Sequence, residues 1–217
     1  MNIALLGPPG AGKGTQAQRI CHEFNLAHLS SGDVLRAEKM AGTQLGLRIR
    51  DFIDKGMLVP DDLMIQLMLE KILALPGGFV LDGFPRTVPQ ARALTDLLHD
   101  ALHPLSLVLN FVVNPRVLSH RFEGRRICPV CLSVYHVDSM PPRVAGLCDN
   151  DGHELLIRED DRPEVVRQRI ELYQASTSPL IAYYAQLGIL KTIDASGSVD
   201  DVSVVVLDKI RRHFAQS

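Results

Sequence analysis

The stretch Met1-Asn-Ile-Ala-Leu-Leu-Gly7-Pro-Pro-Gly10-Ala-Gly12-Lys13-Gly14-Thr15 decides the fold of this chain. Its apolar run at residues 3–6 is typical of a buried strand, the glycines after it favour a turn, and an amphipathic helix is expected next. Glycines let successive backbone N–H groups point into one concave loop, and the new helix presents its positive end. With the ammonium group of Lys13, the stretch predicts a cradle for phosphate, the alternative being a plain glycine turn in an α/β protein.

One residue departs from the general phosphate-loop pattern. Gly14 follows Lys13, and the hydroxyl comes one position later, at Thr15. In other phosphate-loop proteins a hydroxyl residue directly after the lysine contacts Mg²⁺. That mode of Mg²⁺ binding is therefore not assumed for this chain.

The bulk properties are those of an ordinary globular protein. The chain has 217 residues, of which 46% are hydrophobic and 22% charged, with a formal net charge of −2. This length suits one domain with insertions, and the charge gives no global field that would recruit nucleic acid or an anionic membrane. We see no apolar run of membrane-spanning length and no signal peptide, so we expect a cytoplasmic protein with reduced cysteines.

The apolar pattern predicts an α/β fold with a parallel sheet covered by helices on both faces. The expected strands are residues 3–6, 79–81, 105–112 and 189–193. The expected helices are residues 13–24, 31–41, 43–54, 61–73, 89–99, 115–123, 162–187 and 200–213.

Two segments interrupt this alternation. Residues 30–59 are expected to hold small helices and no strand, and residues 124–161 are rich in Cys, Pro, Gly, Asp and Arg around a short β-like run at 133–137. An excursion as long as the second one buries little apolar surface by itself, so it needs a stabilising element of its own.

The cysteines of the second segment supply that element. Cys128-Pro-Val-Cys131 has the spacing of a zinc knuckle, and Cys148-Asp-Asn-Asp151 has the spacing of a second knuckle whose last ligand is a carboxylate. A closed set of four ligands keeps no position for water, so the predicted zinc site is structural. His136 and His153 compete with Asp151 for the fourth place, and free thiols or a redox pair are the alternative to a metal site.

Further motifs contain arginines in a recurrent setting: Asp82-Gly-Phe-Pro-Arg86-Thr87, Gly124-Arg-Arg126, Arg158-Glu-Asp-Asp161 and Arg167-Gln-Arg169. A single arginine is usually a solvated surface group. Taken together with the phosphate loop, however, these motifs make the chain resemble an adenylate kinase of the long form with a zinc-type lid. The resemblance runs from Gly7 to about Gly197, and its most diagnostic parts are residues 82–87 and the cysteine-bearing segment.

The resemblance implies a P-loop nucleoside monophosphate kinase fold with three parts. These are a core domain (1–29, 60–123 and 162–217), an AMP-binding domain (30–59) and a lid domain (124–161). The implied reaction is the reversible transfer of the terminal phosphoryl group of ATP to AMP, which gives two ADP and serves adenine nucleotide homeostasis. It also implies Mg²⁺ with ATP, structural Zn²⁺ in the lid, a monomer, and no nucleic-acid or membrane partner.

Carried over by position, the resemblance also implies site residues. Those for ATP are Gly10, Ala11, Gly12, Lys13, Gly14, Thr15, Arg125, Val134, Tyr135 and Gly197. Those for AMP are Ser31, Arg36, Met57, Leu58, Val59, Gly83, Phe84, Pro85, Arg86, Gln90, Arg158 and Arg169. Those for catalysis are Lys13, Asp82, Arg86, Arg125, Arg158 and Arg169, and those for the metal are Cys128, Cys131, Cys148 and Asp151.

Within these sets the resemblance implies particular roles. Arg36 and Arg86 would hold the AMP phosphate, Gln90 would read the adenine edge, and Asp82 would anchor Mg²⁺ through water. Two positions differ from many relatives. Ser31 replaces a threonine but keeps the hydroxyl, and Gly197 replaces a lysine, so that any ATP contact there would be made by backbone.

Three alternatives stay open. A kinase of another monophosphate, such as UMP or CMP, or one that uses GTP, is the nearest, although related pyrimidine kinases usually have a short lid. A zinc-ribbon nucleic-acid module on a P-loop ATPase is the second, but Tyr135 alone provides no row of stacking aromatics. An inactive structural protein is the third, and it conflicts with the complete set of cationic residues.

Overall fold

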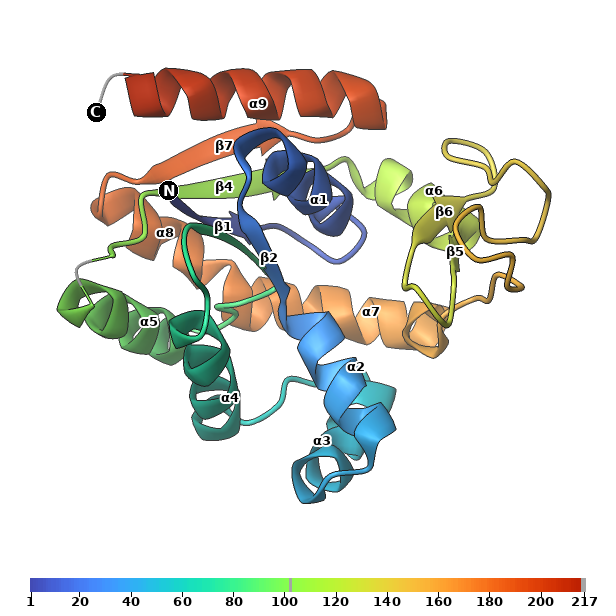
Figure 1. The fold of residues 1–217 in the computed structure, drawn as a ribbon, viewed down its shortest axis with the longest axis horizontal. Helices are drawn as coiled ribbons and strands as arrows, with labels where there is room; N and C mark the ends of the chain where they lie inside the picture. Colours follow the sequence, from blue (N-terminus) through green and yellow to red (C-terminus); the bar gives the residue numbers. More distant parts are fainter. Residues whose placement is uncertain (102, 216–217) are drawn as a thin grey trace.

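The computed structural model describes residues 1–101 and 103–215 and contains a five-stranded parallel sheet. Its strands are β1 (Asn2–Leu6), β2 (Ala27–Ser30), β3 (Phe79–Asp82), β4 (Leu107–Val112) and β7 (Leu190–Asp194), in the order β2-β3-β1-β4-β7 (Figure 1). Leu5 pairs with Asp82 and Leu6 with Asn110, so the carboxyl ends of neighbouring strands meet at one edge. The predicted α/β fold is confirmed.

Helices cover both faces of this sheet because alternate residues of each strand are buried on opposite sides. Ile3 and Leu5 pack with α1 (Lys13–Phe24) and α9 (Val199–Ala215). Ala4 and Leu6 pack with α4 (Asp61–Leu73), α5 (Val88–Asp100) and α8 (Pro179–Gln186) on the other face. No helix of the described residues is long and apolar enough to cross a membrane.

The strand β2 was not predicted. It has only four residues, and Leu29 is its one buried side chain, so it carries too little apolar pattern to stand out in the sequence. The structure places it at the edge of the sheet, where its pairing with β3 decides its conformation.

The single helix expected over residues 162–187 is also wrong. The structure has α7 (Pro163–Leu172), a π-helical turn (Tyr173–Thr177) and then α8. The backbone N–H of Ser178 donates to the carbonyl of Tyr173, five residues back, which widens the helix by one residue. Such turns often occur at functional sites, and their hydrogen-bond shift has no clear signal in apolar periodicity.

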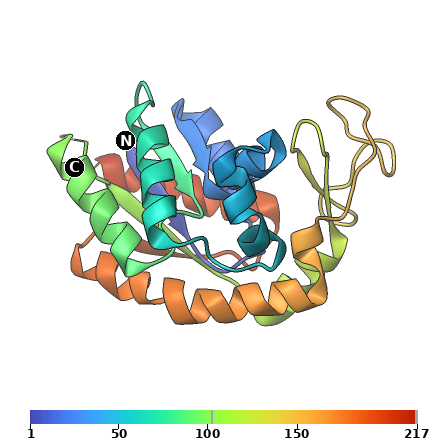
Figure 2. The same ribbon diagram turned by 90° about the horizontal axis from the view of Figure 1, so that it is seen from below.

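Two segments extend from the core at the carboxyl edge of the sheet. Residues 30–59 contain α2 (Ser31–Ala41) and α3 (Gln44–Asp54). Residues 124–161, here called the cysteine segment, follow α6 (Pro115–Gly124) and contain the hairpin of β5 (Arg125–Ile127) and β6 (Val134–His136). Both segments rise from the same side of α7 (Figure 2).

Candidate functional site

The loop between β1 and α1 has a backbone that only glycine adopts easily. Gly7, Gly10 and Gly12 have φ of 140°, 81° and 86°. A Cβ at Gly7 would lie 2.7 Å from the carbonyl oxygen of Phe111, and one at Gly10 would lie 2.8 Å from the ring of Phe122. The helix α1 starts at Lys13 without a side-chain cap, so its first backbone N–H groups are available to an anion.

Lys13 folds back over this loop. Its Nζ donates to the carbonyl oxygens of Gly7 and Pro8, at 2.8 and 2.9 Å. Burial is the main cause that lowers the pKa of Lys13 to about 8; the carboxylate of Asp82 opposes this shift, and the nearby guanidinium of Arg86 adds to it. The site therefore holds a costly positive charge that a phosphate group would stabilise.

A cleft of about 270 Å³ lies over the loop and gathers cationic side chains from across the sequence. Its lining includes the phosphate-loop residues 10–15, the carboxylate of Asp82, and these cations: Lys13, Arg36, Arg86, Arg121, Arg125, Arg158 and Arg169. The guanidinium groups come from α2, the loop after β3, α6, β5, the cysteine segment and α7.

Two neighbouring aspartates balance three of these arginines. Arg125 donates to Asp161 through Nε, at 2.7 Å, and through Nη2. Arg169 Nη1 lies 2.9 Å from Asp160 Oδ2, and Arg158 Nε lies 3.5 Å from Asp160 Oδ1. Burial opposes ionisation of Asp160, but the charges of Arg169 and Arg158 hold its pKa below the usual range. We did not predict these aspartates as site residues, although both stand in the motif with Arg158.

The guanidinium of Arg86 is held by contacts with the loop after β3 and with Ser31. Its Nε donates to the carbonyl of Gly83 at 2.7 Å, and the same carbonyl accepts the hydroxyl of Ser31 at 2.7 Å. Burial lowers the pKa of Arg86, as it does for Arg158 and Arg169. Arg36 pairs with Asp33 one helical turn away and also faces the cleft, beside Met57.

Several predicted nucleotide residues do not line this cleft. Val59 and Phe84 are buried in the core, and Leu58 and Pro85 border a separate cavity of about 70 Å³ behind the phosphate loop. Ser31 and Gln90 are almost fully buried just behind the cleft wall.

The predicted ATP-base residues Val134 and Tyr135 line the cleft, and so does Arg121. Arg121 Nη2 donates to the carbonyls of Ala195 and Gly197, at 2.8 and 3.0 Å, so Gly197 contributes backbone at the edge of this region. We missed Arg121 because it belongs to no motif, but its spacing of four residues from Arg125 was a usable signal.

Asp82 provides the carboxylate of the cleft. It ends β3, beside the phosphate loop, and its Oδ2 lies 3.1 Å from where a Cβ on Gly14 would be. Mg²⁺ prefers oxygen ligands and retains several waters, so a carboxylate next to the phosphate loop suits it.

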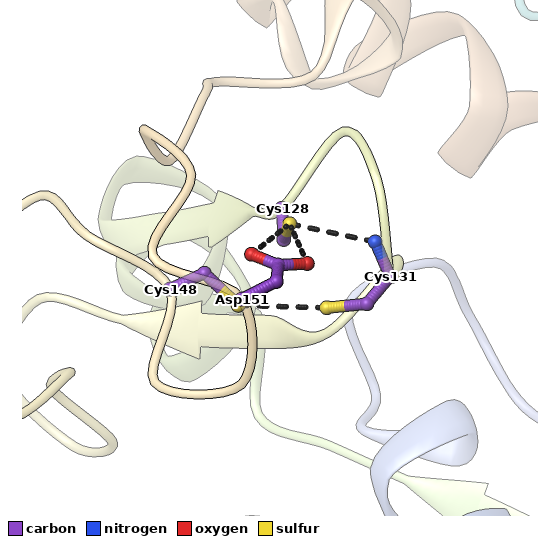
Figure 3. Close-up of side chains that lie close together, drawn as sticks. All are labelled: Cys128, Cys131, Cys148 and Asp151. Carbon is purple, nitrogen blue, oxygen red and sulfur yellow. Dashed lines mark hydrogen bonds between the residues drawn. The ribbon is translucent and has the colours of Figure 1, made fainter.

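The cysteine segment brings the four predicted metal ligands together (Figure 3). Cys128 Sγ lies 3.3 and 3.2 Å from the carboxylate oxygens of Asp151, and Cys131 Sγ lies 3.4 Å from Cys148 Sγ. Zn–S bonds of about 2.3 Å place tetrahedral ligands about 3.8 Å apart, so this set fits a zinc ion with small adjustments. Burial raises the pKa of the Cys128 thiol to about 11 and outweighs the backbone N–H groups of Val130 and Cys131, which donate to its Sγ and lower this pKa.

The two competing histidines lie outside this ligand set. His153 Nδ1 is 3.2 Å from Asp151 Oδ1, so this histidine contacts one of the four predicted ligands and is not part of the set itself. His136 accepts from the backbone N–H groups of Asp138 and Ser139 through Nδ1, and it groups with His120 instead. Among the described residues, the arrangement favours Asp151 as the fourth ligand.

Comparison with known proteins gives a consistent result. The adenylate kinase family model matches residues 5–189. An adenylate kinase of Caldanaerobacter subterraneus subsp. tengcongensis is 44% identical over 204 residues, which cover 93% of this chain and 92% of that protein. Those of Chloroherpeton thalassium and Bacillus subtilis are 46% and 43% identical, and the alignments cover 94% and 96% of this chain and 94% and 97% of those proteins.

Proposed function

The chain belongs to the adenylate kinase family, and we propose that it transfers the terminal phosphoryl group of ATP reversibly to AMP, giving two ADP. The single observation that carries this proposal is the cleft in which Lys13 and six arginines, spread from Arg36 to Arg169 along the chain, converge. Two nucleotides placed end to end bring several negative charges, and cations on all sides suit such a ligand pair better than a lone nucleotide.

We propose that ATP occupies the end of the cleft with the phosphate loop. Backbone N–H groups of residues 10–15 and Nζ of Lys13 would bind its β- and γ-phosphates, while Val134, Tyr135 and Arg121 would flank its base. Asp82 would hold Mg²⁺ beside the phosphates, where the ion would supply positive charge that offsets part of theirs. The position of Asp82 beside Gly14 supports this role.

AMP would occupy the end with Arg36 and Arg86. An oxygen of its phosphate forms a bond to the γ-phosphorus of ATP while the bond from that phosphorus to the β,γ-bridging oxygen breaks, and ADP leaves. Arg125, Arg158 and Arg169 would surround the transferring group, and their guanidinium forks suit its oxygens. The protein contributes alignment and charge and needs no side-chain nucleophile.

The two extending segments have a role in this reaction. We propose that residues 30–59 form an AMP-binding domain and residues 124–161 a lid, and that both close over the substrates. Closure excludes water, which would otherwise accept the phosphoryl group. Zinc held by Cys128, Cys131, Cys148 and Asp151 would stiffen the lid so that it moves as one body. We further propose that the protein acts as a cytoplasmic monomer, and light scattering of the purified protein tests the oligomeric state.

A panel of monophosphates tests the proposed function. Purified protein is supplied with Mg·ATP and, in turn, AMP, UMP, CMP or GMP, and diphosphate formation is followed. A second series replaces ATP by GTP with AMP as the acceptor. We expect AMP and ATP to give the highest kcat/KM. A preference for a pyrimidine monophosphate or for GTP would support the related kinases, and tight nucleic-acid binding in a gel shift without kinase activity would support the nucleic-acid module.

A further inference from the structure

Asp61 accepts hydrogen bonds from two side chains at the start of α5. It is the first residue of α4, where residues 30–59 rejoin the core, and it is half-buried. Its Oδ1 accepts the hydroxyl of Thr87 at 2.9 Å and the amide Nε2 of Gln90 at 2.7 Å. Thr87 caps α5, so the carboxylate lies between the N-termini of two helices, which stabilise its negative charge.

This contact dictates which way the Gln90 amide points. A carboxylate only accepts hydrogen bonds, so Gln90 must turn its NH₂ group toward Asp61. Its Oε1 then accepts the backbone N–H of Arg86 at 2.8 Å. The flipped amide would place an oxygen against the carboxylate and an NH₂ group against an N–H donor. With 1% of its surface exposed, Gln90 has no water to compensate such a mismatch.

An amide held in one orientation can pair only with a base whose donor and acceptor groups come in the matching order. An amide has two N–H donors and two lone pairs on oxygen, so Nε2 and Oε1 of Gln90 each have one hydrogen-bonding position that Asp61 and Arg86 leave unused. Adenine offers an N–H donor at its 6-amino group and an acceptor at N1. Hypoxanthine offers the reverse order, an acceptor at O6 and a donor at N1. The amide that pairs with the first base must flip to pair with the second.

We propose that Asp61 is a positioning residue that sets acceptor specificity by locking the Gln90 amide in the orientation that pairs with adenine and rejects hypoxanthine. This inference rests on the proposed function and on the role that the family resemblance implies for Gln90, which is to read the adenine edge of AMP. The same lock fixes the backbone of Arg86, whose carbonyl accepts the hydroxyl of Thr177 from the π-helical turn at 2.9 Å. The junction of α4 and α5 is thereby linked to the phosphate-binding arginine.

The test measures kcat/KM with AMP and with IMP, using Mg·ATP as donor, for the full chain and for Asp61→Asn. Asparagine can either donate or accept toward Gln90, so only the backbone N–H of Arg86 still favours the original orientation and a flip of the amide costs less free energy. We expect the AMP-to-IMP ratio of kcat/KM to fall about tenfold, with a KM for AMP raised severalfold and a KM for ATP within about twofold of the original. The matched control is Asp62→Asn, which removes a charge from the same helix start at an exposed position and should leave the ratio unchanged.

Further variants separate positioning from a merely structural role. Asp61→Ser, whose hydroxyl suits a helix start, is the second variant in case the asparagine protein does not fold, and the same fall in ratio is expected. In a Gln90→Leu background, Asp61→Asn should produce no further change in the ratio, because the amide it orients is gone. An unchanged ratio in a folded Asp61 variant, or an equal fall in Asp62→Asn, overturns the inference alone. Failure of the unaltered protein to phosphorylate AMP overturns the proposed function and the inference with it.

Discussion

At the scale of the residue, the cleft is lined by positive charges whose burial costs free energy. Burial lowers the pKa of Lys13 to about 8 and that of Arg169 to about 10. Asp160 and Asp161 reduce this cost where arginines cluster, whereas Lys13 Nζ donates to the backbone carbonyls of Gly7 and Pro8. A bound phosphate chain would offset the free-energy cost of burying these positive charges. Part of the binding energy of a nucleotide would therefore come from neutralising them.

Lys13→Met separates catalysis from folding. We expect kcat/KM to fall by about 10²–10³-fold, because one donor to the transferring phosphates is lost. The melting temperature at neutral pH should not fall, since the lowered pKa means that the charged lysine costs stability there, a cost that declines only as pH rises from about 8 toward the ordinary pKa of 10.5. Steady-state kinetics and thermal unfolding check both parts. Near-normal turnover would contradict the assignment of Lys13.

The same shift predicts that nucleotide binding takes up a proton. Above its pKa of about 8 the free Lys13 is largely neutral, whereas phosphate stabilises its protonated form. The affinity for ATP should therefore decrease as pH rises past about 8, and calorimetry at about pH 8.5 in two buffers of different ionisation enthalpy should report proton uptake. Lys13→Met is the control, and equal uptake in that variant would assign the proton to another group.

At the scale of the element, the joint between α6 and the cysteine segment depends on close packing. A Cβ at Gly124 would lie 2.3 Å from the ring of His136, whose Nε2 in turn contacts the carbonyl of His120 in α6. The histidine ring thus occupies the space that a side chain at the end of α6 would take. The end of α6 and the His136 ring are therefore closely packed at this joint.

Gly124→Ala should accordingly destabilise the protein by about 1–3 kcal/mol, because the ring must move out of a buried position. Urea unfolding measures the change. Gly77→Ala is the matched control, since a Cβ there meets nothing within 4 Å, and we expect an effect within about 0.5 kcal/mol. Equal effects of the two substitutions would mean that the His136 contact does not stabilise the joint.

We expect the proposed metal ligands to act on the stability of the cysteine segment more than on the phosphoryl transfer. Cys148→Ser should lower the zinc content and reduce the melting temperature by about 5 °C or more, with a smaller effect on the rate at moderate temperature. Elemental analysis, thermal unfolding and kinetics measure the three quantities. Cys21→Ser, on α1 and far from the ligand set in sequence, is the control for thiol loss. An unchanged metal content in Cys148→Ser would show that the ligand set is wrong.

At the scale of the whole molecule, the cleft joins parts that fold as different elements. Arg86 belongs to the sheet edge, Arg158 to the cysteine segment and Arg169 to α7, yet all three line one cavity. Asp160 lies close to both Arg158 and Arg169, so an ion pair inside the cleft joins the cysteine segment to α7. A ligand that spans the cleft would contact all of these parts at once.

A compound that joins two adenosines through a chain of phosphates tests this arrangement. We expect it to raise the melting temperature more than ATP or AMP at the same concentration, because one ligand collects the contacts of both ends. At about 1,000 times its Kd the stabilisation is about 4 kcal/mol. Arg169→Met should reduce the shift. A shift no larger than that of ATP would contradict two end-to-end nucleotide positions.

The sequence by itself determined the parts whose signals are local. The phosphate loop follows from glycines between an apolar run and a helix, and the metal ligands follow from the spacing of Cys128, Cys131 and Cys148, because these features act over a few residues. The buried strands β1, β3 and β4 were predicted for the same reason, since continuous apolar runs are typical of a parallel sheet.

Only the tertiary structure decided the features that depend on contacts between distant parts of the chain. The strand β2 and the π-helical turn depend on pairing with distant elements, so their own residues carry little pattern. Arg121 and Asp61 acquire their places through contacts with residues 74 and 29 positions away, respectively. Electrostatic interactions and hydrogen bonds act through space, and a linear pattern does not report which distant groups the folded chain brings within their range.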